Sequence, residues 1–585
     1  MLDAFHEEGA LGKAYDARLA RRLWPYLRPY QRLLWIAIGG MAVSTAGALS
    51  RPLVMRWAID EGVVAREHER LMTGGVAIAL VLVVEQLVAY GQLWATQIAG
   101  ARAMADLRRD VFRFLHGLRL GFFDTQPVGR LVTRVTNDVD AILELFASGS
   151  LNALGDLARL VGIVGFMLAL DWRLSLVAFA AVPPVALLVG WLRRYSRESF
   201  REIRAKTARL NAGMNEQVGG MAVVQAYGRE RREFDEFGEV NRAYRDANIA
   251  AIKYEAMQDA AIEMVASVCV AAIVVALGFT GTSFGTLVAF IAYLAMFFEP
   301  VSMLAMRYTL LQSAMAGAER VFGLLDTVAP DAPPAANAAP PRGDAAVAFE
   351  GVDFEYRPGV PVLSGISFEA RPGERIALVG PTGSGKSTIA SLLLRLWDVS
   401  AGVVRVGGRD VRSFTREELR SRFAVVPQDV FLFPGTVADN IAAGGEPDRG
   451  RVRGVLGKLD ALELFERRPG GLDAAVAEQG ANFSAGERQL IAFARALYRD
   501  APVLLLDEAT ASVDSDTEAR LQAALEALMK ERTSLVIAHR LSTIRAADRI
   551  LVIQRGKIVE SGAHEELVAR GGLYARLHEL QFARR

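Results

Sequence analysis

The chain has 585 residues, of which 52% are hydrophobic and 23% charged, and its 67 basic side chains nearly balance its 66 acidic ones. Soluble domains average about 45–50% apolar residues, so the excess excludes a disordered or collagen-like chain and indicates a membrane portion. The charge balance shows no basic surplus of the kind that favours nucleic acid. The single cysteine, Cys269, excludes an internal disulfide and a thiolate metal cluster.

The first 32 residues precede the apolar runs. Met1–Tyr30 lacks the apolar core that a secretory signal requires. Within it, Arg18–Pro29 is basic and carries large apolar side chains at helical spacing. This pattern predicts an interfacial helix along the inner leaflet. We therefore expect residues 1–32 to form an N-terminal tail and an interfacial helix.

Residues 33–325 contain apolar runs long enough to cross a bilayer, which takes about 20 residues per helix. The last run is too long for one helix and is interrupted by the turn composition Thr280-Gly281-Thr282-Ser283. An all-α membrane domain with six transmembrane helices is therefore predicted. The spans are Leu33–Ser50, Leu71–Ala101, Leu145–Leu170, Leu174–Leu192 and the two halves of Met264–Phe298.

Basic residues cluster on one side of the predicted spans. Segments 18–32, 101–135 and 193–253 are rich in arginine, whereas the opposite loops carry only Arg66, Arg70 and Arg173. Because the positive side is cytoplasmic, we expect a multi-pass protein of the cell (inner) membrane with both termini in the cytoplasm. The long internal connections are helix-patterned, so the spans are expected to continue into the cytoplasm.

The sequence of the membrane domain does not identify the transported compound. Thioethers and aromatic rings in the sixth span suit a promiscuous apolar cavity, although helix packing and lipid contact explain them more simply; they are Phe290, Tyr293, Met296, Phe297, Phe298, Met303, Met306 and Met315. Charged side chains within the spans either line the pathway or lock helices together. These are Glu85, Asp156, Arg159, Glu263, Glu299 and Arg307.

A Pro- and Ala-rich segment, Asp326–Gly343, has no apolar period and predicts a linker over residues 326–344. Beyond it, short β-branched runs alternate with helical patterns through residues 345–585. This alternation predicts an α/β nucleotide-binding domain. The expected strands are Val347–Phe349, Arg375–Val379, Val403–Val406, Val425–Val426, Val503–Leu506, Ser534–Ile537 and Ile550–Ile553.

The sequence GPTGSGKST matches the phosphate-binding template G-x-x-x-x-G-K-[ST], and it lies between a strand-like run and a helical pattern, as the template requires. Glycines let the backbone N–H groups face phosphate oxygens, and the helix N-terminus adds positive potential. Lys386 should bridge the β- and γ-phosphates and Ser387 should bind magnesium. The predicted P-loop ATP site comprises Gly380, Pro381, Thr382, Gly383, Ser384, Gly385, Lys386, Ser387 and Thr388.

A second motif, VLLLDEA, reads as a buried strand that ends in two carboxylates. Asp507 suits the magnesium shell. Glu508, one residue further, is placed to polarise a water for in-line attack on the γ-phosphate. The two motifs together predict ATP hydrolysis with ATP and Mg²⁺ as cofactors.

In this combination the chain resembles ABC transporters of the exporter type, in which six spans are fused to one ATP-binding domain, and the resemblance covers nearly the whole chain. It implies that Tyr356 stacks on adenine and that Gln428, in VVPQDVFLF, senses magnesium and the γ-phosphate. It also implies that Asp514 links the two ATP sites, although a helix cap is an alternative for this residue. His539, in IAHRLST, resembles the switch histidine, so Glu508, His539 and Gln428 form the expected catalytic group.

The segment FSAGERQ resembles the signature that clamps the ATP of a partner subunit. The family signature normally reads LSGGQ; here Ser484 and Gly486 are kept, while Ala485 and Glu487 depart from it. Ala485 adds a methyl group where the backbone approaches the nucleotide. Glu487 adds a negative charge near phosphate, which is unfavourable unless an arginine such as Arg488 screens it.

The altered signature bears on the partner. With one P-loop per chain, the resemblance implies a dimer of two half-transporters. A homodimer is the general default. In heterodimeric relatives, however, the subunit with the catalytic glutamate commonly carries the altered signature, so we favour a heterodimer.

Two segments of the long internal connections, Gly121–Leu131 and Gly219–Glu230, resemble the coupling helices that dock on nucleotide-binding domains. The resemblance implies ATP-driven export of hydrophobic or amphipathic compounds, drugs or lipids, by alternating access. A dedicated lipid or glycolipid flippase and a peptide exporter are alternatives, and a non-pumping channel or receptor regulator is a distant one. The expected partners are a second half-transporter, membrane lipids and an amphipathic small molecule, with no nucleic acid.

Overall fold

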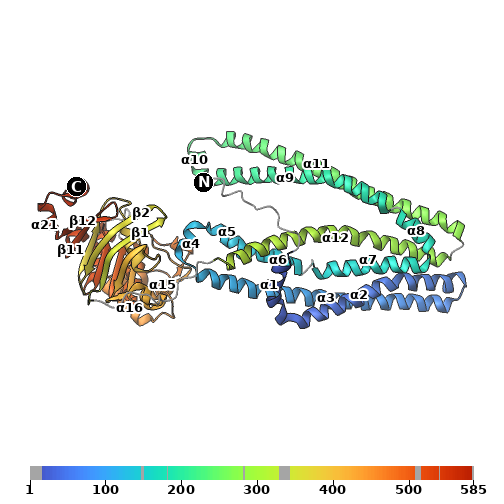
Figure 1. Cartoon of the computed structure of the whole chain (residues 1–585), viewed down its shortest axis with the longest axis horizontal. Helices are drawn as coiled ribbons and strands as arrows, with labels where there is room; N and C mark the ends of the chain where they lie inside the picture. Colours follow the sequence, from blue (N-terminus) through green and yellow to red (C-terminus); the bar gives the residue numbers. More distant parts are fainter. Residues whose placement is uncertain are drawn as a thin grey trace. The chain divides into compact units, whose positions relative to one another are not determined.

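The computed structural model of the chain describes residues 16–146, 150–180, 182–280, 283–327, 343–507, 515–538 and 540–582. Its internal contacts divide the chain into two compact units. Unit 1 comprises residues 1–116 and 128–327, and unit 2 comprises residues 117–127 and 328–585. Figure 1 shows unit 1 as long helices and unit 2 as strands and shorter helices. A helical membrane domain followed by an α/β nucleotide-binding domain is the fold class predicted above, and it is confirmed.

Unit 1 has a helix at each of the six predicted spans, and most of these helices extend past the apolar run. They are α2 (Gln31–Trp57), α3 (His68–His116), α7 (Ser150–Leu170), α8 with α9 (Trp172–Ala180 and Val182–Gly219), α11 (Glu230–Thr280) and α12 (Phe284–Leu325). Among the described residues, four stretches are long and apolar enough to cross a membrane, and Phe284–Phe297 is a shorter apolar helix. The predicted break in the last apolar run lies between α11 and α12, where the Ser283 side chain caps α12 by accepting from the Thr286 amide.

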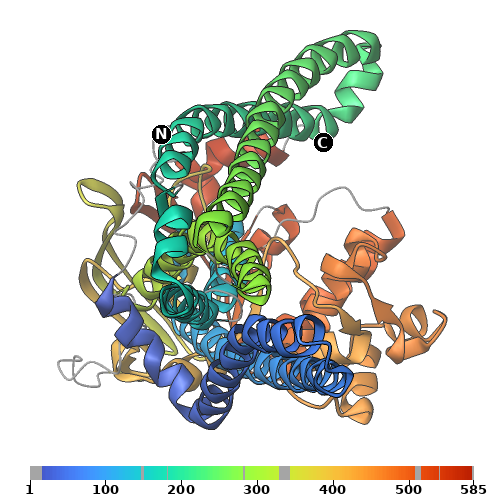
Figure 2. The same ribbon diagram turned by 90° about the vertical axis from the view of Figure 1, so that its right-hand side faces the viewer.

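The extensions beyond the spans end in short helices. In Figures 1 and 2, α9 and α11 form an arm whose tip, at α10 (Met221–Ala226), diverges from the other helices of unit 1. Both predicted coupling segments contain such a helix, α10 in one and α4 (Leu120–Thr125) in the other. The chain returns to the bundle through α5 (Val128–Thr133) and α6 (Val139–Glu144).

The predicted interfacial helix is α1 (Ala17–Leu27), which is capped by the Asp16 side chain. It buries Leu23 and Leu27 and leaves Trp24 52% exposed, which is the pattern of a helix with one apolar face on the bundle. The Arg22 guanidinium pairs with Asp326, the residue after α12, at 2.6 Å. This pair ties the start of the chain to the end of the sixth span.

Charged side chains inside the spans pair across helices. Arg51 of α2 lies 3.3 Å from the buried Glu85 of α3, and Arg307 of α12 lies 2.7 Å from Asp156 of α7. A charge in a low-dielectric environment is costly unless paired, so Glu85, Asp156 and Arg307 fit the helix-locking alternative. Glu263 is exposed, and the Glu299 side chain lies outside the described residues.

Most of the aromatic side chains of the sixth span that the structure describes pack inside unit 1. Phe290, Tyr293 and Phe297 are buried, and the Tyr293 hydroxyl donates to the Leu49 carbonyl oxygen at 2.6 Å. Helix packing therefore accounts for these three residues. Met303 and Met306 are 37% and 66% exposed.

Unit 2 contains two main sheets. An antiparallel sheet has the order β2-β1-β4-β5, formed by β1 (Val347–Arg357), β2 (Val360–Ala370), β4 (Ala401–Val406) and β5 (Arg409–Asp410). A mixed sheet has the order β12-β11-β3-β10-β9-β6, formed by β3 (Arg375–Val379), β6 (Phe423–Val426), β9 (Val503–Asp507), β10 (Thr533–Ile537), β11 (Arg549–Gln554) and β12 (Lys557–Gly562). The minor pair is β7 (Gly435–Thr436) with β8 (Ala475–Val476).

Helices pack on one face of the mixed sheet and the antiparallel sheet contributes to the core on the other, so both faces are buried. Alternate residues of β3 belong to two separate apolar cores, Ala377 to one and Ile376 to the other. Burial on both faces explains why these strands read as continuous apolar runs. The helices of unit 2 include α13 (Lys386–Leu393), α14 (Arg416–Ser421), α15 (Val437–Ala442), α16 (Arg449–Lys458), α17 (Leu462–Glu466), α18 (Ala485–Arg499), α19 (Ser515–Met529), α20 (Leu541–Arg545), α21 (His564–Ala569) and α22 (Leu573–Phe582).

We predict that the Arg51–Glu85 pair stabilises unit 1. Glu85→Gln leaves Arg51 without its buried anion and should lower the free energy of unfolding by about 2 kcal/mol, measured by thermal unfolding in lipid nanodiscs. The double variant Arg51→Met with Glu85→Leu should recover most of this loss because two apolar side chains need no partner.

The matched control is Glu61→Gln. Glu61 pairs with Arg70, but both side chains are about half exposed, at 46% and 45%, so the loss should stay below about 0.5 kcal/mol. Equal stability of Glu85→Gln and Glu61→Gln would contradict a structural role for the buried pair.

Candidate active site

The site is built on one edge of the mixed sheet. Strands β3, β10, β9 and β6 are parallel, and the register aligns Leu378 of β3 with Ile537 of β10 and Ile537 with Asp507 of β9. Parallel strands bring their carboxyl ends to the same edge, where ligands of α/β sheets bind. The P-loop follows β3, and Gln428, whose side chain is exposed, comes two residues after β6.

The P-loop needs its glycines for two different reasons. Gly383 and Gly385 have φ angles of 80° and 103°, a left-handed region that favours glycine. Gly380 is required for space, since a Cβ there would lie 2.1 Å from the Ile553 carbonyl oxygen of β11. The loop is therefore pressed against the sheet and curled before α13 begins at Lys386.

The Lys386 ammonium lies inside this loop. Its Nζ donates to the carbonyl oxygens of Gly380 and Pro381 at 2.8 and 3.0 Å, and the residue is 7% exposed. Burial lowers the pKa of Lys386, an effect that the nearby Asp507 opposes. The buried Ser384 hydroxyl has no hydrogen-bond partner among the described residues. A buried cation and an unpartnered hydroxyl in a curled loop are what a phosphate group would use.

Two oxygen donors meet beside the loop. The Ser387 hydroxyl donates to Asp507 Oδ2 at 3.3 Å, so the first turn of α13 touches the end of β9. A hydroxyl and a carboxylate are hard oxygen ligands of the kind that Mg²⁺ prefers. The described residues contain no cluster of three or more His, Cys, Asp or Glu that could hold a metal. Any magnesium here would rely on phosphate oxygens and water for its remaining ligands.

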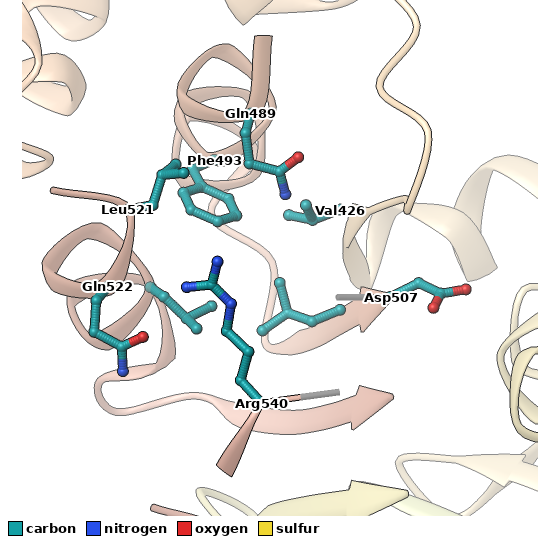
Figure 3. A pocket seen from close by; sticks show the side chains of 9 residues that line it. Val426, Gln489, Phe493, Asp507, Leu521, Gln522 and Arg540 are labelled. Carbon is teal, nitrogen blue, oxygen red and sulfur yellow. The ribbon is translucent and has the colours of Figure 1, made fainter. Parts of the chain in front are cut away.

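Three expected site residues, Glu508, Asp514 and His539, lie outside the described residues. Their flanking residues are described: Asp507 ends β9, and Arg540 precedes α20. Figure 3 shows that the Arg540 guanidinium and the Gln489 amide point into a small, largely apolar pocket beside β9, while the Asp507 carboxylate points away from it. The pocket is lined by residues of β9, α18 and α19 and by Arg540, the residue after His539.

Tyr356 lies at the end of β1, beside the P-loop helix. Its ring is 43% exposed and meets Trp397 edge to face at 5.1 Å. Its hydroxyl lies 3.2 Å from Thr388 Oγ1, although the sequence assigns the two residues to different motifs. The structure therefore brings the expected adenine-binding ring next to the expected phosphate-binding loop.

The signature forms the N-terminus of α18. The Ser484 hydroxyl accepts from the Glu487 amide at 3.2 Å, and Glu487 Oε2 accepts from the Ser484 amide at 2.8 Å, a reciprocal capping box. Ser484 and Ala485 are exposed and Gly486 is buried. Glu487 thus serves as the cap of its own helix.

The arginine that screens Glu487 is Arg468, and the suggestion that Arg488 does so is wrong. The Arg468 Nη2 atom lies 2.9 Å from each Glu487 carboxylate oxygen. Arg488 instead donates to the Phe483 carbonyl oxygen at 2.9 Å. Residues three and four apart share a helix face, so Arg488, directly after Glu487, was a poor candidate for this ion pair. Arg468 lies in the preceding loop, and no local sequence pattern indicates that it pairs with Glu487.

The α4 segment belongs to unit 2 by its contacts. A Cβ at Gly121 would lie 2.4 Å from the Trp397 ring, so only glycine allows this approach, and Arg119 lies 3.8 Å from Asp398. Trp397 therefore touches both Tyr356 and the first predicted coupling helix. Sequence reasoning missed it, because a tryptophan after a P-loop helix has no motif of its own.

Comparison with known proteins gives the following matches. The family described as "ABC transporter transmembrane region" matches residues 34–301, and the family described as "ABC transporter" matches residues 363–511. An ATP-dependent lipid A-core flippase of Burkholderia pseudomallei (strain 1710b) is 36% identical over 98% of this chain and 97% of its own length. A protein of the same description from Thiobacillus denitrificans is 35% identical over 96% of this chain and 98% of its own length.

A solved structure shares the fold. The structure of a bacterial Atm1-family ABC exporter with ATP bound aligns with a TM-score of 0.73 and 28% sequence identity, and the alignment covers 94% of this chain and 98% of the other. The similarity therefore spans both units.

We predict that Tyr356→Ala raises the KM for ATP about tenfold with a smaller change in kcat. Stacking on an aromatic ring is worth about 1–3 kcal/mol per base, and adenine is remote from the γ-phosphate, so the loss should be mainly in binding. Tyr356→Phe is the control, because it keeps the ring and removes only the contact with Thr388. Steady-state ATPase assays in lipid decide: an unchanged KM with a collapsed kcat would exclude the stacking role.

Proposed function

Because this chain belongs to the ABC transporter family, as an exporter-type half-transporter that hydrolyses ATP, we propose that it exports lipids or other amphipathic compounds as a dimer. ATP binding would close two nucleotide-binding domains, and hydrolysis would reopen them. Closure and reopening would drive the spans between inward- and outward-facing states. Transport therefore depends on the ATP site of unit 2 and on the helices of unit 1.

The contact between Ser387 and Asp507 carries the ATP part of the proposal. It places a hydroxyl and a carboxylate 3.3 Å apart, beside the buried ammonium of Lys386. Bound Mg²⁺ would supply positive charge to the β- and γ-phosphates at this point. In the same proposal Lys386 neutralises phosphate charge, and the P-loop amides orient the nucleotide.

Glu508, His539 and Gln428 are proposed as the hydrolytic group. Glu508 follows Asp507 directly, so its carboxylate would accept a proton from the attacking water. His539 would contact the γ-phosphate, and the exposed Gln428 would report nucleotide occupancy toward the membrane domain. Asp514 would link the two sites of the dimer.

A lipid or lipid-like amphiphile is the proposed substrate class. Full-length relatives are described as lipid A-core flippases, and the exposed Met303 and Met306 offer adaptable apolar surface within the sixth span. Drugs are included in this class because a thioether surface discriminates weakly between apolar ligands. A peptide exporter finds no specific support among the described residues.

The two short helices α4 and α10 are proposed as the coupling elements, with the N- and C-termini in the cytoplasm. Within unit 2, α4 already contacts the nucleotide-binding domain through Trp397 and Asp398. At the tip of its arm, α10 presents the apolar side chains Met221 and Val223, which are 40% and 58% exposed. Movement of either helix would be passed along α3 or along α9 and α11 to the membrane.

We propose a homodimer as the working unit, although the sequence alone favoured a heterodimer. That preference rested on the altered signature beside an intact catalytic glutamate. The charge that Glu487 adds to this signature is neutralised by its ion pair with Arg468. Ala485 is exposed at the first position of α18, where a methyl group is compatible with helical backbone. The signature is therefore compatible with a working ATP site.

Glu508→Gln should lower steady-state ATP hydrolysis more than tenfold while ATP binding persists. The amide has the shape of the carboxylate but cannot accept the proton, and a tenfold loss corresponds to about 1.4 kcal/mol of barrier. The exposed Glu526 of α19 gives the control, since Glu526→Gln keeps both the fold and the site. Retention of more than a tenth of the rate would remove Glu508 from its proposed role.

Expressed without any partner, the chain should purify as a dimer and hydrolyse ATP at about 1 s⁻¹ or faster, within the usual range of enzymes. Size analysis and ATPase assays in lipid measure both properties. An inactive chain that gains activity on addition of a second, related half-transporter would instead establish the heterodimer.

A further inference from the structure

One arginine contacts two residues of the signature and the residue directly before it. Arg468 lies just after α17, nineteen positions before Glu487 in the chain. Its guanidinium lies 4.0 Å from the centre of the Phe483 ring. It also donates to the Asn482 carbonyl oxygen at 3.4 Å and to the Glu487 carboxylate. A single side chain thus holds the entry to α18.

The Glu487 carboxylate is fully engaged within its own domain. Oε1 accepts from Arg468 Nη2 and Nε at 2.9 and 3.2 Å, and Oε2 accepts from Arg468 Nη2 and the Ser484 amide at 2.9 and 2.8 Å. The side chains of Arg468 and Glu487 are 27% and 15% exposed. Burial would raise the pKa of Glu487, but the Ser484 amide and Arg468 lower it overall, so the carboxylate is charged and paired at neutral pH.

We propose that Arg468 is a positioning residue for ATP binding: it cancels the charge of Glu487 and orients Ser484, so that FSAGE presents a neutral surface to the partner's triphosphate. This inference rests on the proposed function, in which the signature faces the ATP of a second copy. It explains how the chain tolerates an acidic residue where the family has glutamine.

The alternative is that Arg468 only anchors a loop, and the two roles differ in what rescues its loss. Without Arg468, an uncompensated carboxylate would face the phosphates, and like charges repel. Glutamine at position 487 can still accept the Ser484 amide through its carbonyl oxygen, so it keeps the cap and removes the charge. If Arg468 acts through its charge, adding Glu487→Gln to Arg468→Gln should restore ATP binding. If Arg468 only anchors the loop, it should not.

The experiment compares Arg468→Gln, Glu487→Gln and the double variant in the full-length dimer in lipid, by ATPase titration at low and physiological salt. Arg468→Gln should raise the KM for ATP about fivefold and change kcat less than about twofold. The interaction that is lost would stabilise bound ATP equally in the ground state and the transition state. The rise should shrink as salt screens the repulsion. Glu487→Gln is the reference for the double variant, whose KM for ATP should lie within about twofold of that of Glu487→Gln, because without the carboxylate the loss of Arg468 leaves no uncompensated charge.

Arg467→Gln is the matched control. Arg467 is the neighbouring arginine and pairs with Glu463 at the surface, with side chains 81% and 83% exposed, so its loss should leave the KM unchanged. An Arg468→Gln variant indistinguishable from Arg467→Gln, or a double variant as impaired as Arg468→Gln, overturns the inference. If Arg468→Gln does not fold, folding of the double variant supports the charge role, and misfolding of both overturns it.

Separate results test the proposed function and the role of Arg468. Wild-type turnover that depends on Glu508 supports the proposed function whatever Arg468→Gln does. A normal KM in Arg468→Gln then removes only the role of Arg468.

Discussion

The parallel pairing of β3, β10, β9 and β6 is the constraint on which the rest of unit 2 depends. It brings the P-loop, Asp507 and the segment before Gln428 to one edge, although they are far apart in sequence. Burial of the sheet on both faces holds the strands in register. Once the P-loop has turned the chain from β3 into α13, Ser387 meets Asp507 at the end of β9.

Charge compensation is the second theme, and it takes different forms in the two units. Inside the spans, Glu85 and Asp156 are paired with arginines of neighbouring helices, since a bilayer offers no water to an unpaired charge. At the signature, Arg468 pairs with Glu487, and in its proposed role it leaves no net negative charge on the surface that would face the partner's triphosphate. Lys386 differs, because it is held by carbonyl oxygens and can exchange them for phosphate.

Sequence reasoning predicted the fold class and the P-loop because local patterns determine them. The β3 run matches the observed strand at both ends, and helices occur at all six expected spans. It missed β2 (Val360–Ala370), which has no continuous β-branched run and owes its place to pairing with β1. It also missed Trp397 and Arg468, because their contacts join segments that are distant in the sequence and produce no recognisable motif. The Arg488 suggestion failed for the same reason.

Transport in a defined membrane distinguishes an exporter from an ATPase that moves no substrate. Proteoliposomes would contain only this chain and a fluorescent anionic amphiphile, and the measurement is the ATP-dependent movement of that amphiphile between leaflets. An exporter should move the amphiphile only when ATP is present, and Glu508→Gln should stop this movement. If the proteoliposomes hydrolysed ATP but moved no amphiphile in a panel of lipids and drugs, export would be contradicted and a non-pumping role indicated.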